Sequence, residues 1–120
     1  MERLKIIRDN SLTLEEAFGK FIINRKIKVL SEYTVIYYEK WFNYFTSYLK
    51  GEYDNPENMT IKYLNKEVAA GFIYWLKDNY NMKNVSINTR LRGLRAFLYY
   101  LMEQKYIQGF KIDFLKAEKN

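Results

Sequence analysis

Residues 86–101 read SINTRLRGLRAFLYYL, and this stretch decides the fold class. Its aliphatic residues recur every three or four positions, the spacing of one buried helical face. They are Ile87, Leu91, Leu94, Leu98 and Leu101. Asn88, Arg92, Arg95 and Tyr99 repeat with the same spacing on a neighbouring face. We therefore expect a helix with a core on one side and an anionic partner on another.

The positive charge of the chain is concentrated in this stretch. Three of the six arginines lie between positions 90 and 95, and no acid occurs between Asp78 and Glu103. The whole chain carries a formal charge of +6, which favours nucleic acid, an acidic protein or an anionic membrane surface as partner. A solvated helix face is the alternative reading of these arginines.

Length and composition indicate one folded domain without an active site. The chain has 120 residues, of which 48% are hydrophobic and 18% aromatic. It contains no cysteine and no histidine, so it lacks a thiolate nucleophile, the commonest general base and the commonest metal ligand. We expect no metal, cofactor or small-molecule substrate. No stretch is apolar for the roughly 20 residues of a membrane span, so we expect a cytoplasmic protein.

The first two predicted helices form a hairpin. Thr13 and Glu16 can make a capping box, so the first helix should start after Thr13 and end near residues 26–28. The second should run from Ser31, as N-cap, to about Lys50, with Gly51 as its stop. Residues 52–60 then read as a loop.

The last two predicted helices form a second hairpin. Asn65 is a good N-cap for the third helix, and Ser86 for the fourth, after a turn over residues 78–85. The fourth should reach about Lys105 and be broken by Gly109. We expect an all-α fold, a compact bundle of four main helices arranged as two helical hairpins, with residues 110–120 as a short exit segment.

The second and fourth helices begin alike, with Ser-x-x-Thr at positions 31–34 and 86–89. Helix N-termini bind phosphate through unpaired N–H groups and partial positive charge. If both starts share a surface, they form a DNA-contacting edge, although serine is also simply a common N-cap. The candidate DNA-binding residues are Ser31, Thr34, Tyr37, Lys40, Lys83, Ser86, Asn88, Thr89, Arg90, Arg92 and Arg95. Helical geometry lets Asn88 and Arg92 reach base edges in a major groove.

A second function also fits the sequence. Tyr37, Trp41, Tyr44 and Tyr48 form an aromatic stripe beside the main apolar stripe of the second helix. The exposed part of this stripe would dock a protein partner, and the chain would then be a helical protein-interaction domain.

Several stretches resemble the core-binding domain of tyrosine recombinases, the phage-type integrases. They are LTLEEAF (12–18), SEYTVIYY (31–38) with Phe42, Phe45 and Leu49, the stretch 86–101, and EQKYI (103–107). The resemblance implies a SAM-like helical bundle over residues 12–108, with an N-terminal extension at 1–11 and an exit segment at 109–120 leading toward a catalytic domain.

The resemblance also implies a function. Such a domain forms half of a clamp around double-stranded DNA, contacts other recombinase protomers, and leaves catalysis to a separate domain. The DNA contacts that it implies are Ser31, Thr34, Tyr37, Ser86, Thr89, Arg90 and Arg95. We therefore expect a non-catalytic, DNA-binding module of a bacterial or phage integrase.

Overall fold

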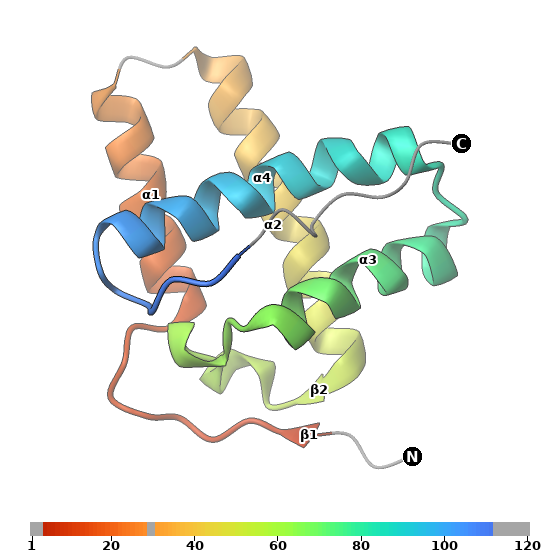
Figure 1. The fold of residues 1–120 in the computed structure, drawn as a ribbon, viewed down its shortest axis with the longest axis horizontal. Helices are drawn as coiled ribbons and strands as arrows, with labels where there is room; N and C mark the ends of the chain where they lie inside the picture. The colour runs from red at the N-terminus through yellow and green to blue at the C-terminus, as the bar shows by residue number, and fades with distance from the viewer. Residues whose placement is uncertain (1–3, 29–30, 112–120) are drawn as a thin grey trace. The chain divides into compact units, whose positions relative to one another are not determined.

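The computed structural model describes residues 4–28 and 31–111 and confirms the all-α class (Figure 1). Its four main helices are α1 (Leu14–Ile27), α2 (Glu32–Glu52), α3 (Lys66–Tyr80) and α4 (Asn84–Glu103). The remaining elements are two short strands and two 3-10 turns, namely β1 (Leu4–Lys5), β2 (Tyr53–Asp54), η1 (Pro56–Asn58) and η2 (Ile61–Tyr63). The chain divides into two units, residues 1–63 and 64–120.

The first unit is built on the α1–α2 hairpin, which has an aromatic core. Phe21, Trp41 and Phe45 are at most 1% exposed. Phe18 of α1 stacks on Phe42 of α2, with 3.9 Å between ring centroids and 6° between ring planes. The predicted capping box is confirmed, since Thr13 Oγ1 accepts from the Glu16 N–H and the Glu16 carboxylate accepts from the Thr13 N–H.

Residues before Thr13 are attached to this unit by main-chain pairing. β1 pairs with β2 in parallel, Ile6 is fully buried, and the Ile61 N–H donates to the Leu12 carbonyl at 2.9 Å. Residues 52–60, expected as a loop, contain the last residue of α2, then β2 and η1, and η2 follows them. Such short elements are held by backbone hydrogen bonds and do not require a periodic pattern of hydrophobic residues. The sequence pattern therefore did not predict them.

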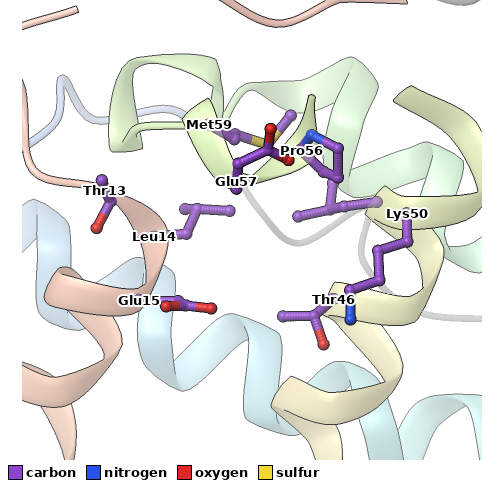
Figure 2. Close-up of a pocket in the computed structure, with 9 residues that line it drawn as sticks. Thr13, Leu14, Glu15, Thr46, Lys50, Pro56, Glu57 and Met59 are labelled. Atoms are coloured by element: carbon purple, nitrogen blue, oxygen red, sulfur yellow. The ribbon is translucent and has the colours of Figure 1, made fainter. Parts of the chain in front are cut away.

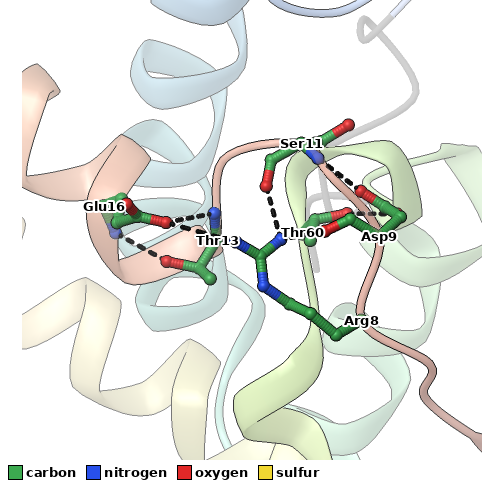
Figure 3. A network of polar contacts seen from close by, with 6 residues as sticks. All are labelled: Arg8, Asp9, Ser11, Thr13, Glu16 and Thr60. Carbon is green, nitrogen blue, oxygen red and sulfur yellow. Dashed lines mark hydrogen bonds and ion pairs between the residues drawn. The ribbon is translucent and has the colours of Figure 1, made fainter.

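Polar side chains reinforce the same attachment (Figure 3). The buried Thr60 hydroxyl donates to Asp9 at 2.8 Å, and the Ser11 N–H donates to the same carboxylate at 2.7 Å. These donors, Ser11 first, hold the pKa of Asp9 below its ordinary value. The N–H of Thr13 likewise lowers the pKa of Glu16, which Arg8 also faces at 3.8 Å.

The second unit is built on the α3–α4 hairpin. Asn65 caps α3 as predicted, its side-chain oxygen accepting from the Val68 N–H at 2.9 Å. The predicted aliphatic stripe of α4 is confirmed, because its five residues, Ile87, Leu91, Leu94, Leu98 and Leu101, are at most 1% exposed. From α3, Phe72 and Leu76 are fully buried as well.

Several predicted helix ends are wrong. Gly51 lies inside α2, whose C-cap is Tyr53. Ser86 is not an N-cap, because α4 begins at Asn84 with Lys83 as the capping residue, and α3 extends to Tyr80. Gly109 does not break α4, which ends at Glu103.

The helix ends are made by residues other than glycine. Asn81 after α3 and Lys105 after α4 adopt the left-handed conformation, and no described glycine has a positive φ. Phe110 is partly buried. The sequence also suggests that apolar residues of the exit segment dock on the body of the domain, but three of them, Ile112, Phe114 and Leu115, lie outside the described residues.

Candidate nucleic-acid interface

The polar row of α4 lies on its exposed side. At about 100° per residue, Asn88, Arg92, Arg95 and Tyr99 fall within about 60° of one another, away from the buried aliphatic stripe. Arg92 is exposed, Tyr99 is 55% exposed, and Asn88 and Arg95 are half-buried. No described residue forms a hydrogen bond or ion pair with Arg92. The core thus fixes which side of α4 this row presents.

Arg90 does not belong to this row. It lies about 160° around the helix axis from Arg92. Its guanidinium Nη1 donates to the Ser86 carbonyl at 3.4 Å, so the side chain runs back along α4 toward its start. The cationic face expected from three neighbouring arginines therefore consists of Arg92 and Arg95, with Arg90 on another side of the helix.

The start of α4 differs from the expected serine cap. Lys83 is exposed at the capping position, and its side chain makes no capping hydrogen bond. Ser86 lies in the first turn, and the Thr89 hydroxyl donates to the Val85 carbonyl at 3.1 Å. The first turn contains no acid. The N–H groups at such a helix start keep a partial positive charge that can bind an anion.

The start of α2 is capped as predicted. Ser31 Oγ accepts from the Thr34 N–H at 3.3 Å, and the two hydroxyl oxygens lie 3.1 Å apart. Lys40 is exposed and Tyr37 half-buried on the following turns. Tyr33, 85% exposed, is a surface aromatic that the sequence reading did not assign to the site. Tyr33 lies outside the apolar stripes of the second helix, so the helical period alone gave it no role.

The candidate residues thus form two groups, one in each unit. Ser31, Thr34, Tyr37 and Lys40 lie at the start of α2, and the remaining seven lie along α4. These two sets of residues belong to different units, and a surface common to both stays a prediction.

The aromatic stripe of α2 is largely in the core. Trp41 is 1% and Tyr48 3% exposed, while Tyr37 and Tyr44 are half-buried. Burial also raises the pKa of Tyr48. Trp41 and Tyr48 are therefore unavailable to a partner, whereas Tyr37 and Tyr44 are partly exposed. Docking of a protein through this exposed part of the stripe stays a prediction.

One shallow pocket lies in the first unit, between the start of α1, the end of α2 and η1 (Figure 2). Its volume is about 170 Å³. Small-molecule sites usually have roughly 300–1,000 Å³. Glu15, Glu57 and Lys50 stand at its sides, and Leu14, Leu49 and Met59 contribute apolar walls. It is too small to suggest a substrate or cofactor site.

The described part of the chain has neither a metal-ligand cluster nor a helix suited to a membrane. In residues 4–28 and 31–111, no three or more Asp, Glu, His or Cys residues are grouped so that they could hold a metal ion. No helix in these ranges is both long enough and apolar enough to cross a membrane.

The chain has four helices in two hairpins, and the last helix has a polar and cationic row on the face next to its core stripe. This architecture fits a SAM-like helical domain. The family model of the phage integrase SAM-like domain matches residues 13–117, so the chain belongs to this family. Comparisons with curated proteins and with solved structures gave no significant match.

Proposed function

We propose that this chain is the DNA-binding module of a site-specific tyrosine recombinase and that it grips a recombination half-site without catalytic residues of its own. The exposed row on α4 carries the proposal. The buried stripe on the neighbouring face of α4 fixes the orientation of this row, and the side chains of the row suit a duplex.

Three residues of the row would have distinct tasks. Arg92, exposed near the middle of the row, would enter the major groove, where arginine pairs with guanine O6 and N7. Asn88, one turn earlier, matches the N6 and N7 edge of adenine. Arg95 would contact the backbone, where a guanidinium binds phosphate through two hydrogen bonds.

The helix starts would hold the flanking phosphates. Lys83 and the uncapped first turn of α4, with Ser86 and Thr89, form one phosphate contact. Ser31, Thr34, Tyr37 and Lys40 of α2 form another. Arg90 is included because of the family resemblance, and its bond to the Ser86 carbonyl places it beside the same turn.

The parent protein would be a bacterial or phage integrase acting on DNA in the cytoplasm. Its catalytic residues would lie in another domain, and other protomers on the DNA would be further partners. A single module buries about 600–1,000 Å² on DNA, so the chain alone should bind weakly.

Fluorescence anisotropy with a duplex over a salt series tests this proposal. Each lost phosphate contact reduces the slope of log affinity against log salt by about one unit. We expect this reduction for Arg95→Ala. The matched control is Lys77→Ala, which removes one exposed cation of α3 and should leave the slope nearly unchanged. A slope near zero for the unaltered chain would contradict the proposal.

A second series separates base readout from charge. Arg92→Lys keeps the positive charge but loses the planar fork, so it should keep the salt slope and lose preference among duplex sequences. Asn88→Ala should lose preference without changing the slope. Equal effects on all duplexes would remove the major-groove assignment and leave only backbone binding.

A further inference from the structure

The outer side of α1 has an apolar face that no described residue covers. Gly19, Ile23 and Ile27 are four residues apart and share this side of the helix. Ile23 is 61% and Ile27 74% exposed. The exposed Lys20 and Lys26 flank them. We call these five residues the α1 face.

Gly19 is unusual within this face. A Cβ added there would meet no atom of the described residues within 4 Å, so packing among these residues does not require a glycine. Glycine inside a helix is less stable than alanine. A glycine at this position would be useful if the backbone of a partner approached closely, since small residues allow helices to come close.

The outer side of α2 has the complementary character. Ile36 is 48% exposed, and Glu32 and Glu39 lie one turn before and one turn after it. Both glutamates are exposed, and no described cation forms an ion pair with either. We call these three residues the α2 face. It pairs an apolar centre with acidic flanks, where the α1 face has an apolar centre with basic flanks.

We propose that two copies of this chain associate through these faces, with the α1 face of each copy against the α2 face of the other. Because one chain has both complementary faces, a second copy satisfies both at once in a two-fold arrangement. The isoleucines would form the centre and the Lys–Glu pairs the rim. This inference rests on the proposed contact between protomers, and it is tested without DNA.

The association should be weak. Stable interfaces bury at least about 1,200 Å² in total, more than a few isoleucines and their neighbours supply. Rim charges are screened by salt, so association should be stronger at low ionic strength. Two copies held on neighbouring DNA sites would be at high effective concentration, where a weak contact is sufficient.

Charge reversal tests the pairing. One variant carries Lys20→Glu and Lys26→Glu, and the other carries Glu32→Lys and Glu39→Lys. In sedimentation velocity at low salt, each variant alone should associate at least tenfold more weakly than the unaltered chain, because like charges then face one another. An equimolar mixture should recover the association, because both contacts become complementary again.

Lys77→Glu is the control for changed net charge. It should leave the association constant within about twofold of that of the unaltered chain, because an exposed charge outside the interface contributes little. Circular dichroism confirms that each variant is folded. A monomeric unaltered chain, or a mixture that fails to recover, overturns the proposal. Because no DNA is present, either result leaves the DNA-binding proposal untouched.

Gly19→Ala supplies an independent test. It should raise the thermal midpoint, because the new methyl group has free space and alanine favours the helix. It should also weaken association, because the same methyl group would hold the partner away. A variant that is more stable and associates as well as the unaltered chain would remove Gly19 from the interface.

Discussion

Lys105 ends α4 in a conformation that a side chain disfavours. Its φ is 60°, and its N–H donates to the Met102 carbonyl at 3.0 Å. The next N–H, of Tyr106, donates to the Leu101 carbonyl at 2.9 Å. These two bonds define a Schellman motif, and the Tyr106 ring packs on Tyr100 at 6.3 Å. The motif is complete, but the residue at its left-handed position is not the preferred one.

Lys105→Gly should therefore stabilise the chain. A left-handed residue with a Cβ costs roughly 1–2 kcal/mol. Glycine removes this cost, but about half of the gain is lost because glycine has more conformational freedom in the unfolded chain. We expect a gain of about 0.5–1 kcal/mol in urea unfolding. Lys105→Ala retains the Cβ and is the control. Equal stability of the two variants would show that the conformation is not strained.

Asp9 should make stability depend on acid. Its pKa is lowered by the Ser11 N–H and the Thr60 hydroxyl, so the folded state binds a proton less readily than the unfolded chain. Stability is then fully present above the ordinary pKa of 3.8 and falls as pH decreases through the lowered value. In urea unfolding between pH 7 and 2.5, Asp9→Asn should flatten this fall. Asp78→Asn changes an exposed carboxylate outside the network and should not.

At the scale of helices, two similar serines have different positions. Ser31 caps α2, whereas Ser86 lies inside the first turn of α4. Losing an N-cap costs typically about 1 kcal/mol. Ser31→Ala should therefore lower the free energy of unfolding by about this amount. Ser86→Ala should change it by no more than about 0.5 kcal/mol, because alanine suits a helix interior. Equal losses would contradict the assigned start of α4.

The same pair shows what the sequence could and could not predict. Side-chain caps that bond three residues on, at Thr13, Ser31 and Asn65, were identified correctly because their partners are local. Ser86 has the same local pattern, but the N-cap of α4 lies three residues earlier, at Lys83, which supplies no side-chain bond. The helix ends at Asn81 and Lys105 depend on backbone conformation, for which lysine gives no signal.

The candidate site shows the same division. The exposed row and the buried stripe of α4 were predictable, because a helical period fixes which residues share a side. The helical period also puts Arg90 and Arg92 on different sides of α4. Their closeness in the sequence does not show this difference. Whether the two helix starts share a surface depends on long-range packing, which a helical period does not predict.

For the whole molecule, charge is divided unequally between the units. Residues 1–63 contain ten Lys and Arg with nine Asp and Glu, and residues 64–120 contain ten with five. The first unit is thus nearly neutral, and the second carries most of the charge of +6. Phosphate attraction grows with the number of cations near the backbone. The second unit should therefore dominate the affinity, with the start of α2 as a smaller contribution.

NMR titration with a short duplex resolves this division. We expect the largest amide shifts at residues 83–99, smaller shifts at 31–40, and little change at the β1–β2 pairing, which lies in the nearly neutral unit. Raising the salt should reduce both sets of shifts, because each depends on released counterions. Shifts confined to residues 83–99 would assign DNA contact to α4 alone and remove the start of α2 from the site. If neither region shifted, Arg92 and Arg95 would be an ordinary solvated helix face, as in many soluble proteins.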